Sequence, residues 1–218
     1  MKNPYTVVRD FEAAVCEYTG APYCVAVNSC TSALLLAVAW QFWKDIPPEH
    51  APILGVRSVE IPKRTYVSVP MSIIHAGGRP TFRDEEWRGF YQLKPLGVFD
   101  CARRFTSGMS RNMGVHADVA PIFQCVSFHA TKILADTQGG AILHDSAEAD
   151  AWLRRARFDG RTEGVEPKDD TFTQIGYHCY MSNDVAARLL LKIRSLPKHN
   201  DDLLNDQYPD LSQMEIFK

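Results

Sequence analysis

The chain has 218 residues, of which 45% are hydrophobic, and a formal net charge of -2. A chain of this length can bury one main core, and so small a net charge gives no overall field that would draw it to DNA or to an anionic membrane. The longest apolar stretch, Ala33 to Trp43, is too short to span a bilayer, and the N-terminus lacks a signal-peptide core. We therefore predict a soluble intracellular protein with one main domain.

The six cysteines stand at positions 16, 24, 30, 101, 125 and 179, with no Cys-x-x-Cys pair and no metal-like spacing with histidine. Several lie in apolar runs, where a free thiol behaves as a small hydrophobic group. These features predict reduced thiols, a cytoplasmic location and no metal site.

Helical and strand patterns alternate along the chain. Apolar residues at positions 8, 11, 15 and 18 favour a helix that ends at Gly20, because they share one helical face. A strand over 23–27 and a helix beginning near 28–31 follow. Further strands are expected over 58–62, 80–83, 96–100, 121–129 and 139–145, and further helices over 68–76, 146–158 and 183–196.

This alternation predicts an α/β fold of three layers with a mainly parallel central sheet. In such folds ligands collect at the carboxyl ends of strands, where several candidate polar residues fall. Residues 1–200 are expected to form one compact domain. Residues 201–218 are acidic and weakly periodic, which predicts a loosely attached tail or an arm that contacts a partner.

Lys132 follows a strand-like run and a polar turn in the stretch "SFHATKILADTQGGAIL". A lysine amine attacks carbonyl groups when burial or neighbouring cations lower its pKa. An isolated lysine is usually a solvated surface charge, because lysines are seldom buried. Ser127 and Thr131 flank it with hydroxyl groups, and Gln138 to Gly140 supply a turn where backbone can approach closely.

Three other features carry candidate chemistry. Asp100 ends an apolar strand, where an acid can hold a proton on a pyridine nitrogen, although turn aspartates are common. The stretch "NSCTSAL" offers a helix N-terminus to a phosphate, or merely caps the helix. Tyr66 can stack on a planar ring or simply belong to the core.

Taken together, these residues resemble the DegT/DnrJ/StrS-type sugar aminotransferases, which are fold-type I enzymes that use pyridoxal 5'-phosphate. The similarity runs from about Phe11 to Leu196, and its blocks occur in the order seen in that family. They are "FEAAVCEYTGAPYCVAVNSCTSALLLAV", "IPKRTYVSVPMSIIHAGGRPTF", "SFHATKILADTQGGAIL" and "GYHCYMSNDVAARLLLKI".

The resemblance implies a role for each matching position. Lys132 would form the Schiff base with the cofactor and then move a proton as a general acid and base, Asp100 would pair with the ring nitrogen, and Tyr66 would cover the ring face. Ser127 and the backbone of Cys30 and Thr31 would hold the phosphate. The catalytic residues are therefore Lys132 and Asp100, and the implied cofactor-binding set is Ser29, Cys30, Thr31, Tyr66, Asp100, Arg103, Ser127, His129, Lys132 and His178.

The sequence also departs from the family. Cys30 replaces the usual glycine of the phosphate loop, where a side chain limits positive φ and close approach. Arg103 stands where Gln or His usually lies near the cofactor's phenolic oxygen. His178 replaces the asparagine that reaches the partner subunit's phosphate, so the resemblance implies a homodimer with shared sites.

The chain is also strongly shortened. Between Arg83 and Asp100 there is little room for the strand and helix that the family places there. Past Leu196 the C-terminal small domain that closes over the substrate is largely missing, so the site is expected to be more open and wetter. Arg103, Arg104, Arg111, Arg154, Arg155, Arg157 and Arg161 either line this opening or, for those near 154–157, end a solvated helix.

The preferred hypothesis is a dimeric pyridoxal-phosphate enzyme that moves an amino group from a small amino donor to a keto or aldehyde acceptor resembling a sugar nucleotide. A decarboxylase or lyase acting on an unusual amino acid, a nucleotide or an amino-acid-modified nucleic-acid base is an alternative, although the net charge gives a nucleic-acid substrate no help. A non-catalytic scaffold is a second alternative. It needs neither Lys132 nor Asp100, so their retention favours catalysis.

Overall fold

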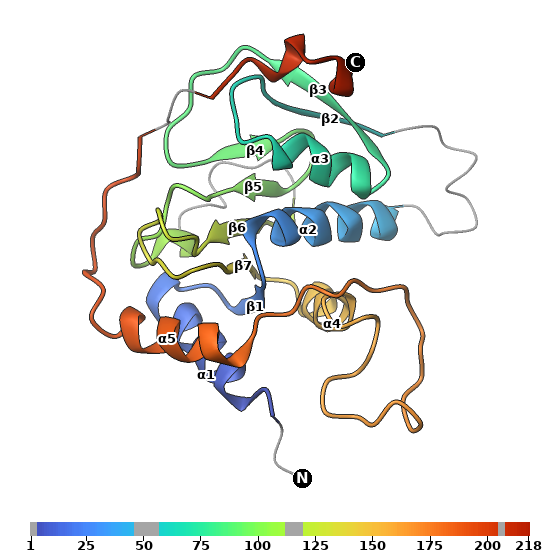
Figure 1. Cartoon of the computed structure of the whole chain (residues 1–218), viewed down its shortest axis with the longest axis vertical. Coiled ribbons are helices and arrows are strands. Elements are labelled where there is room, and N and C mark those ends of the chain that lie inside the picture. The colour runs from blue at the N-terminus through green and yellow to red at the C-terminus, as the bar shows by residue number, and fades with distance from the viewer. Residues whose placement is uncertain (1–3, 46–56, 112–119, 205–207) are drawn as a thin grey trace.

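The computed structural model describes residues 4–45, 57–111, 120–204 and 208–218. Helices cover both faces of a central sheet, which gives three layers (Figure 1). The helices are α1 (Thr6–Thr19), α2 (Cys30–Asp45), α3 (Ser68–His75), α4 (Ala147–Ala156) and α5 (Asn183–Ile193). The strands are β1 (Tyr23–Val27), β2 (Arg57–Pro62), β3 (Gly78–Arg83), β4 (Tyr91–Leu93), β5 (Val98–Asp100), β6 (Phe123–Ser127) and β7 (Gly140–His144), and the 3-10 helices η2 (Leu211–Gln213) and η3 (Glu215–Phe217) follow.

The sheet confirms the α/β class but is mixed, and the expectation of a mainly parallel sheet is corrected. The order is β1-β7-β6-β5-β4, with β2 and β3 as a separate parallel pair. Only β5 and β6 pair in parallel within the larger sheet, while the β1–β7, β6–β7 and β4–β5 pairs are antiparallel. Two backbone hydrogen bonds between Glu60 and Lys94 join β2 to the end of β4.

The antiparallel β4–β5 pair was not predicted, and its cause is the short connection. Only residues 94–97 separate the two strands. A parallel neighbour needs a crossover of a dozen or more residues, whereas an antiparallel neighbour needs only a hairpin. The chain therefore returns directly from β4 to β5.

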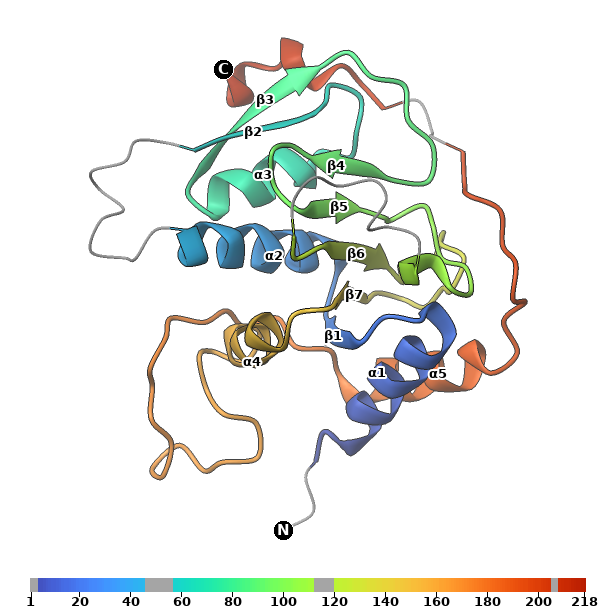
Figure 2. The ribbon, with the colours of Figure 1, turned by 180° about the vertical axis from the view of Figure 1, so that it is seen from behind.

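Successive residues of the central strands belong in turn to two apolar clusters, one on each face of the sheet. Val25 and Val27 of β1 pack with α2, α3 and α4 on one face, and Cys24 and Ala26 pack with α1 and α5 on the other. Strand side chains alternate between faces, so strands buried on both sides read as continuous apolar runs. The same two helical layers lie on either side of the sheet when it is viewed from behind (Figure 2).

Local sequence signals set several helix ends where they were expected. Gly20 ends α1 with a φ of 78°, in the left-handed region, and its N–H donates to the carbonyl of Cys16. Ser146 caps α4 through a hydrogen bond from Ala149 N. Within the described part of the chain, no helix is long and apolar enough to cross a membrane.

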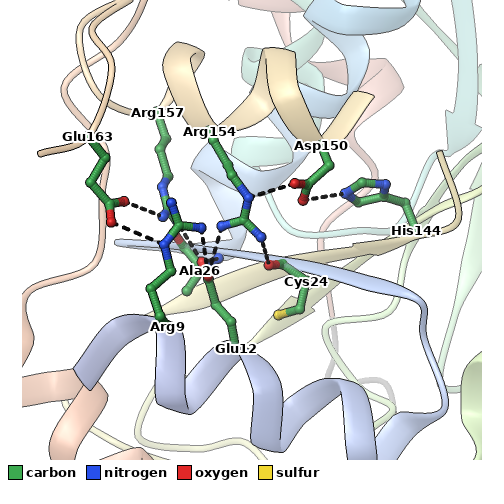
Figure 3. Close-up of polar contacts among 9 residues, drawn as sticks. All are labelled: Arg9, Glu12, Cys24, Ala26, His144, Asp150, Arg154, Arg157 and Glu163. Atoms are coloured by element: carbon green, nitrogen blue, oxygen red, sulfur yellow. Dashed lines mark hydrogen bonds and ion pairs between the residues drawn. The ribbon is translucent and has the colours of Figure 1, made fainter. Parts of the chain in front are cut away.

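A buried network of charges ties α1 and β1 to α4 (Figure 3). Glu12 of α1 accepts hydrogen bonds from Ala26 N at 2.8 Å and from Arg157, and it pairs with Arg154 at 2.8 Å. Arg157 also donates to Ala26 O and pairs with Glu163 at 3.2 Å. Its side chain is 2% exposed, so this guanidinium depends on its acidic partners.

The network corrects the expectation for the arginines of α4. Arg154 and Arg157 neither line an opening for phosphates nor form a solvated helix end, because both are paired within the fold. Arg154 also pairs with Asp150 at 2.7 Å. Burial raises the pKa of Asp150 to about 6.

The C-terminal segment packs against the domain instead of hanging loosely from it. Leu203 N donates to Arg103 O, and Leu211 N donates to Lys63 O. Leu211 is fully buried and Phe217 nearly so, with the Phe217 ring 6.1 Å from that of Phe82. The described residues 201–204 and 208–218 are therefore held by backbone bonds and apolar burial.

We predict that Glu12→Gln destabilises the fold strongly. The change removes the negative charge that compensates buried Arg157, and breaking a buried ion pair costs about 3–5 kcal/mol. Urea unfolding should show a loss of this size, while Glu17→Gln, at an exposed position of the same helix, should leave the free energy of unfolding nearly unchanged. Equal effects of the two variants would contradict this role of Glu12.

Candidate active site

A cavity of about 380 Å³ lies where the C-terminal ends of β5 and β6 meet the N-terminus of α2. This volume is within the range of small-molecule sites, about 300–1,000 Å³. The structure brings together all but one of the residues predicted to act there, and the exception is His178. The predicted residues in the lining are Ser29, Cys30, Thr31, Tyr66, Asp100, Arg103, Ser127, His129 and Lys132.

The N-terminus of α2 forms one wall of the cavity. Ser29 caps the helix, because its hydroxyl accepts a hydrogen bond from Ser32 N at 3.1 Å. Thr31 Oγ1 donates to Ser68 Oγ at 2.8 Å, which ties this wall to α3. The first N–H groups of a helix have no acceptor within it and lie at its positive end, so this wall suits an anion.

Gly140 allows this helix start to lie against β7. A Cβ placed on Gly140 would come within 2.5 Å of Cys30 N and of the Ser29 carbonyl carbon. Side chains cannot approach backbone so closely, and only glycine fits. The close backbone approach predicted for the Gly139–Gly140 turn is confirmed, although its partner is the helix start.

Cys30 fits without the positive φ expected of the glycine it replaces. It is the first residue of α2, and Asp159 is the only non-glycine residue with positive φ in the described ranges. The Cys30 thiol contacts Cys125 O at 3.6 Å. Burial, together with the nearby Asp100 carboxylate, raises the pKa of this thiol well above its usual value, so it stays protonated.

Asp100 lies at the base of the cavity, at the end of β5. One of its carboxylate oxygens accepts from Ala102 N at 2.9 Å and the other from the Tyr91 hydroxyl at 2.7 Å. Burial raises its pKa above the usual value, while these two hydrogen bonds and the Lys132 charge oppose that rise. A buried carboxylate with several stabilising donors is suited to meet a cationic group in the cavity.

Lys132 lies in the loop between β6 and β7, and its side chain is partly buried at the cavity. The loop is closed at its base, where Phe128 N donates to Gly139 O and Asp136 N donates to Phe128 O. Lys132 N donates to His129 O at 2.9 Å, which forms a turn at the lysine. Lys132 therefore lies at the cavity and is not a fully solvated loop residue.

Asp136 fastens this loop to α5. Its buried carboxylate pairs with Arg188 at 2.8 Å and with Lys192 at 2.9 Å. The hydrogen bonds from Arg188 hold the pKa of Asp136 well below its usual range. The loop that carries Lys132 is therefore tied to a helix in another layer, a link that the sequence analysis missed.

Three of the predicted residues are arranged to contact a flat ligand and its anionic group. Tyr66 is 57% exposed, which leaves its ring available for stacking. Ser127 is buried at the end of β6, and its hydroxyl lies 3.4 Å from His129 N. His129 is exposed at the rim, with Nδ1 3.3 Å from Thr131 Oγ1.

The remaining two predictions have different outcomes. Arg103 lines the cavity but also binds the C-terminal segment, donating to Leu204 O and to the Tyr208 hydroxyl at 3.0 Å. His178 lies away from the cavity lining, with its side chain 71% exposed and Nδ1 2.9 Å from Asp159 Oδ2. Its predicted contact with a partner subunit stays a prediction.

Four residues that the sequence analysis did not single out complete the site. Tyr91 and Thr65 are buried and share a hydrogen bond, so Asp100, Tyr91 and Thr65 form a chain. Trp87 and Tyr208 line the cavity. The alternating pattern "FYQL" could have indicated the strand that carries Tyr91, whereas nothing in the tail sequence places Tyr208.

We predict that Asp136→Asn lowers the free energy of unfolding by about 2 kcal/mol at pH 7, because it weakens hydrogen bonds between charged groups. The folded-state pKa is depressed, so the stabilisation is present above the unfolded pKa of about 3.9 and is lost as pH falls below it. Urea unfolding across this range should show the difference between variant and wild type shrinking below about pH 4. Asp184 is an exposed carboxylate that also pairs with Arg188, so Asp184→Asn should have a much smaller effect and serves as the control. A difference between Asp136→Asn and wild type that stays constant at all pH values would contradict the assignment.

Known structures share this fold. The sugar aminotransferase CalS13 from Micromonospora echinospora has a TM-score of 0.66 and 19% identity over 87% of this chain and 60% of its own. Helicobacter pylori PseC, an aminotransferase involved in the biosynthesis of pseudoaminic acid, has a TM-score of 0.63 and 18% identity over 86% and 57%. GDP-4-keto-6-deoxymannose-3-dehydratase (ColD) has a TM-score of 0.67 and 15% identity over 88% and 61%.

These identities show likeness of fold alone, and the chain spans about three fifths of the length of these proteins. No functionally curated protein matches the sequence. The sequence matches a family description over residues 1–98 and 98–203, nearly the whole chain. The chain belongs to the DegT/DnrJ/EryC1/StrS aminotransferase family.

Proposed function

We propose that the chain is a pyridoxal-phosphate-dependent aminotransferase that moves an amino group from an amino acid to a keto or aldehyde acceptor of the sugar-nucleotide type. One observation carries the proposal, namely that Lys132, Asp100, Ser127 and the N-terminus of α2 line one cavity. The family membership and the sugar aminotransferase among the similar structures support the same activity.

The cavity fits the cofactor in its chemistry. Buried Asp100 presents a carboxylate that a protonated ring nitrogen would neutralise, and the start of α2 with Ser127 offers donors to a phosphate. Tyr66 exposes a ring suited to cover the pyridine face. When bound, pyridoxal 5'-phosphate supplies an aldehyde that amines attack and a ring that withdraws electrons.

Each residue then has a separate task. Lys132 would hold the cofactor through its aldehyde, and its amine would carry a proton to and from the substrate as a general acid and base. Asp100 would hold a proton on the ring nitrogen, and Tyr91 fixes the carboxylate by its 2.7 Å hydrogen bond. Gly140 and Asp136 hold the helix start and the lysine loop at the same cavity.

We predict that Lys132→Ala abolishes covalent attachment of the cofactor. Wild-type protein mixed with pyridoxal 5'-phosphate should develop a yellow absorption band that borohydride bleaches, leaving a reduced pyridoxyl mass on the peptide containing Lys132. The matched variant Lys168→Ala removes an exposed lysine outside the cavity and should behave as wild type. A band of equal strength in Lys132→Ala would refute the assignment, and release of a keto acid from amino donors would identify transamination.

We further propose a homodimer with shared sites in the cytoplasm. His178 is 71% exposed, and the same loop presents Phe172 at 62% and Ile175 at 87% exposure, which supports burial against a second copy. The proposed location is supported by six free cysteines, since thiols of this number stay reduced in that compartment.

We predict that the protein loaded with cofactor scatters light as a dimer. If His178 reaches the partner's site, mixing inactive Lys132→Ala with weakened His178→Ala under conditions of subunit exchange should restore part of the activity, because each mixed dimer then has one intact site. A fully occupied, active monomer would contradict the shared site. His199→Ala, at an exposed histidine outside the cavity lining, should keep wild-type activity and serves as the control.

A further inference from the structure

The C-terminal segment is fastened to both loops that carry outer residues of the cavity. Asp202 accepts two hydrogen bonds from Arg104, at 2.9 and 2.6 Å, next to Arg103 in the loop after β5. Farther along, Leu211 N donates to Lys63 O, and Asp210 lies 3.7 Å from Lys63 Nζ, just before Tyr66. Residues 201–204 and 208–211 are therefore each anchored to one of these loops.

Tyr208 lies between these two anchors and lines the cavity. Arg103, which is 7% exposed, donates to its hydroxyl from Nη2 at 3.0 Å and from Nε at 3.3 Å. The Arg103 guanidinium also lies 5.4 Å from the centre of the Tyr208 ring. A buried arginine thus holds the ring at the cavity from one side.

Tyr208 completes a frame of three aromatic rings, each from a different part of the chain. Its ring is within 11° of parallel to that of Trp87, with the centroids 6.4 Å apart. It meets the Tyr66 ring at 64°, also with a centroid distance of 6.4 Å. Trp87 is fixed in turn by a hydrogen bond from Nε1 to Arg64 O at 2.9 Å and by an edge contact with Tyr91.

We propose that Tyr208, in the C-terminal segment, forms a wall of the active site together with Trp87, and that these two rings bind a flat, conjugated ring of the substrate. The proposal rests on the proposed function, because it assigns Tyr66, Asp100 and the start of α2 to the cofactor and the rings of Trp87 and Tyr208 to the substrate. Asp100, Ser127 and the start of α2 line the same cavity as Trp87 and Tyr208. Arg103 holds the Tyr208 ring there through its hydrogen bonds to the hydroxyl.

The geometry favours a flat ring over other groups. Nearly parallel ring faces attract another π-system, and stacking on such faces tolerates a range of ring types. The rings of Trp87 and Tyr208 lie within 11° of parallel and both line the cavity. A flat ring can stack on such faces, whereas a puckered ring is thicker and contacts them less completely.

The test uses two probes that differ in ring shape. Uridine 5'-monophosphate has a flat ring, and 5,6-dihydrouridine 5'-monophosphate has a puckered one with the same sugar and phosphate. Calorimetric titration of the cofactor-loaded protein should show the flat probe binding about fivefold or more tightly, the lower end of base–aromatic stacking. Cofactor affinity, measured separately from the absorption band, reports on the proposed function itself.

Variants of the frame decide whether these rings are responsible. Tyr208→Ala and, independently, Trp87→Leu should remove the preference for the flat probe while leaving cofactor affinity within about twofold. Tyr208→Phe keeps the ring and should keep the preference, and Leu204→Ala, at an exposed position of the same segment, is the control. Lack of preference in the wild type, or a preference unchanged in Tyr208→Ala, would overturn the proposal.

A loss of cofactor affinity in Tyr208→Ala with the ring preference intact would also overturn it, because Tyr208 would then cover the cofactor. Failure of the wild type to bind cofactor would instead refute the proposed function. The ring preference would then be measured on the protein without cofactor, so the two failures are distinguishable.

Discussion

The close contact between Gly140 and the peptide linking Ser29 to Cys30 is the constraint on which the site depends. A Cβ added to Gly140, the first residue of β7, would lie 2.5 Å from the backbone at the start of α2. β7 is also the antiparallel partner of β6, which ends at Ser127. One glycine therefore fixes three parts of the site relative to one another. They are the N-terminus of α2, the strand that carries Ser127 and the loop that carries Lys132.

Buried charges hold this arrangement from the outside. The Glu12 and Arg157 network joins α1, β1 and α4, while Asp136 joins the lysine loop to α5. Ionic contacts of this kind require good geometry, because taking charges out of water costs several kcal/mol per ion. Their positions on several layers of the fold indicate that the layers are set by paired charges as well as by apolar packing.

A hairpin and the C-terminal residues both contribute to the cavity. The hairpin joins β4 to β5 and places Tyr91 beside Asp100. The last residues return to the site, where Tyr208 meets Arg103. Tyr208 thus lines the cavity of a chain that spans about 60% of the length of a similar aminotransferase.

The sequence by itself determined the elements with local signals and the chemistry of the site. Gly20, the cap at Ser146 and the periodic apolar residues marked helices, and continuous apolar runs marked buried strands. Motif order placed Lys132, Asp100, Tyr66 and Ser127 in one site, and the structure brings them together. These features depend on neighbours in the sequence or on a family pattern.

Only the tertiary structure decided what depends on distant partners. The reversed direction of β4 follows from a short connection that must still complete a sheet, and the buried state of Arg157 follows from Glu12, far away in the sequence. The positions of Asp136 and Tyr208 are likewise set by α5 and Arg103. The sequence alone does not distinguish a solvated polar residue from one that is buried and paired, because burial is a property of the packed layers.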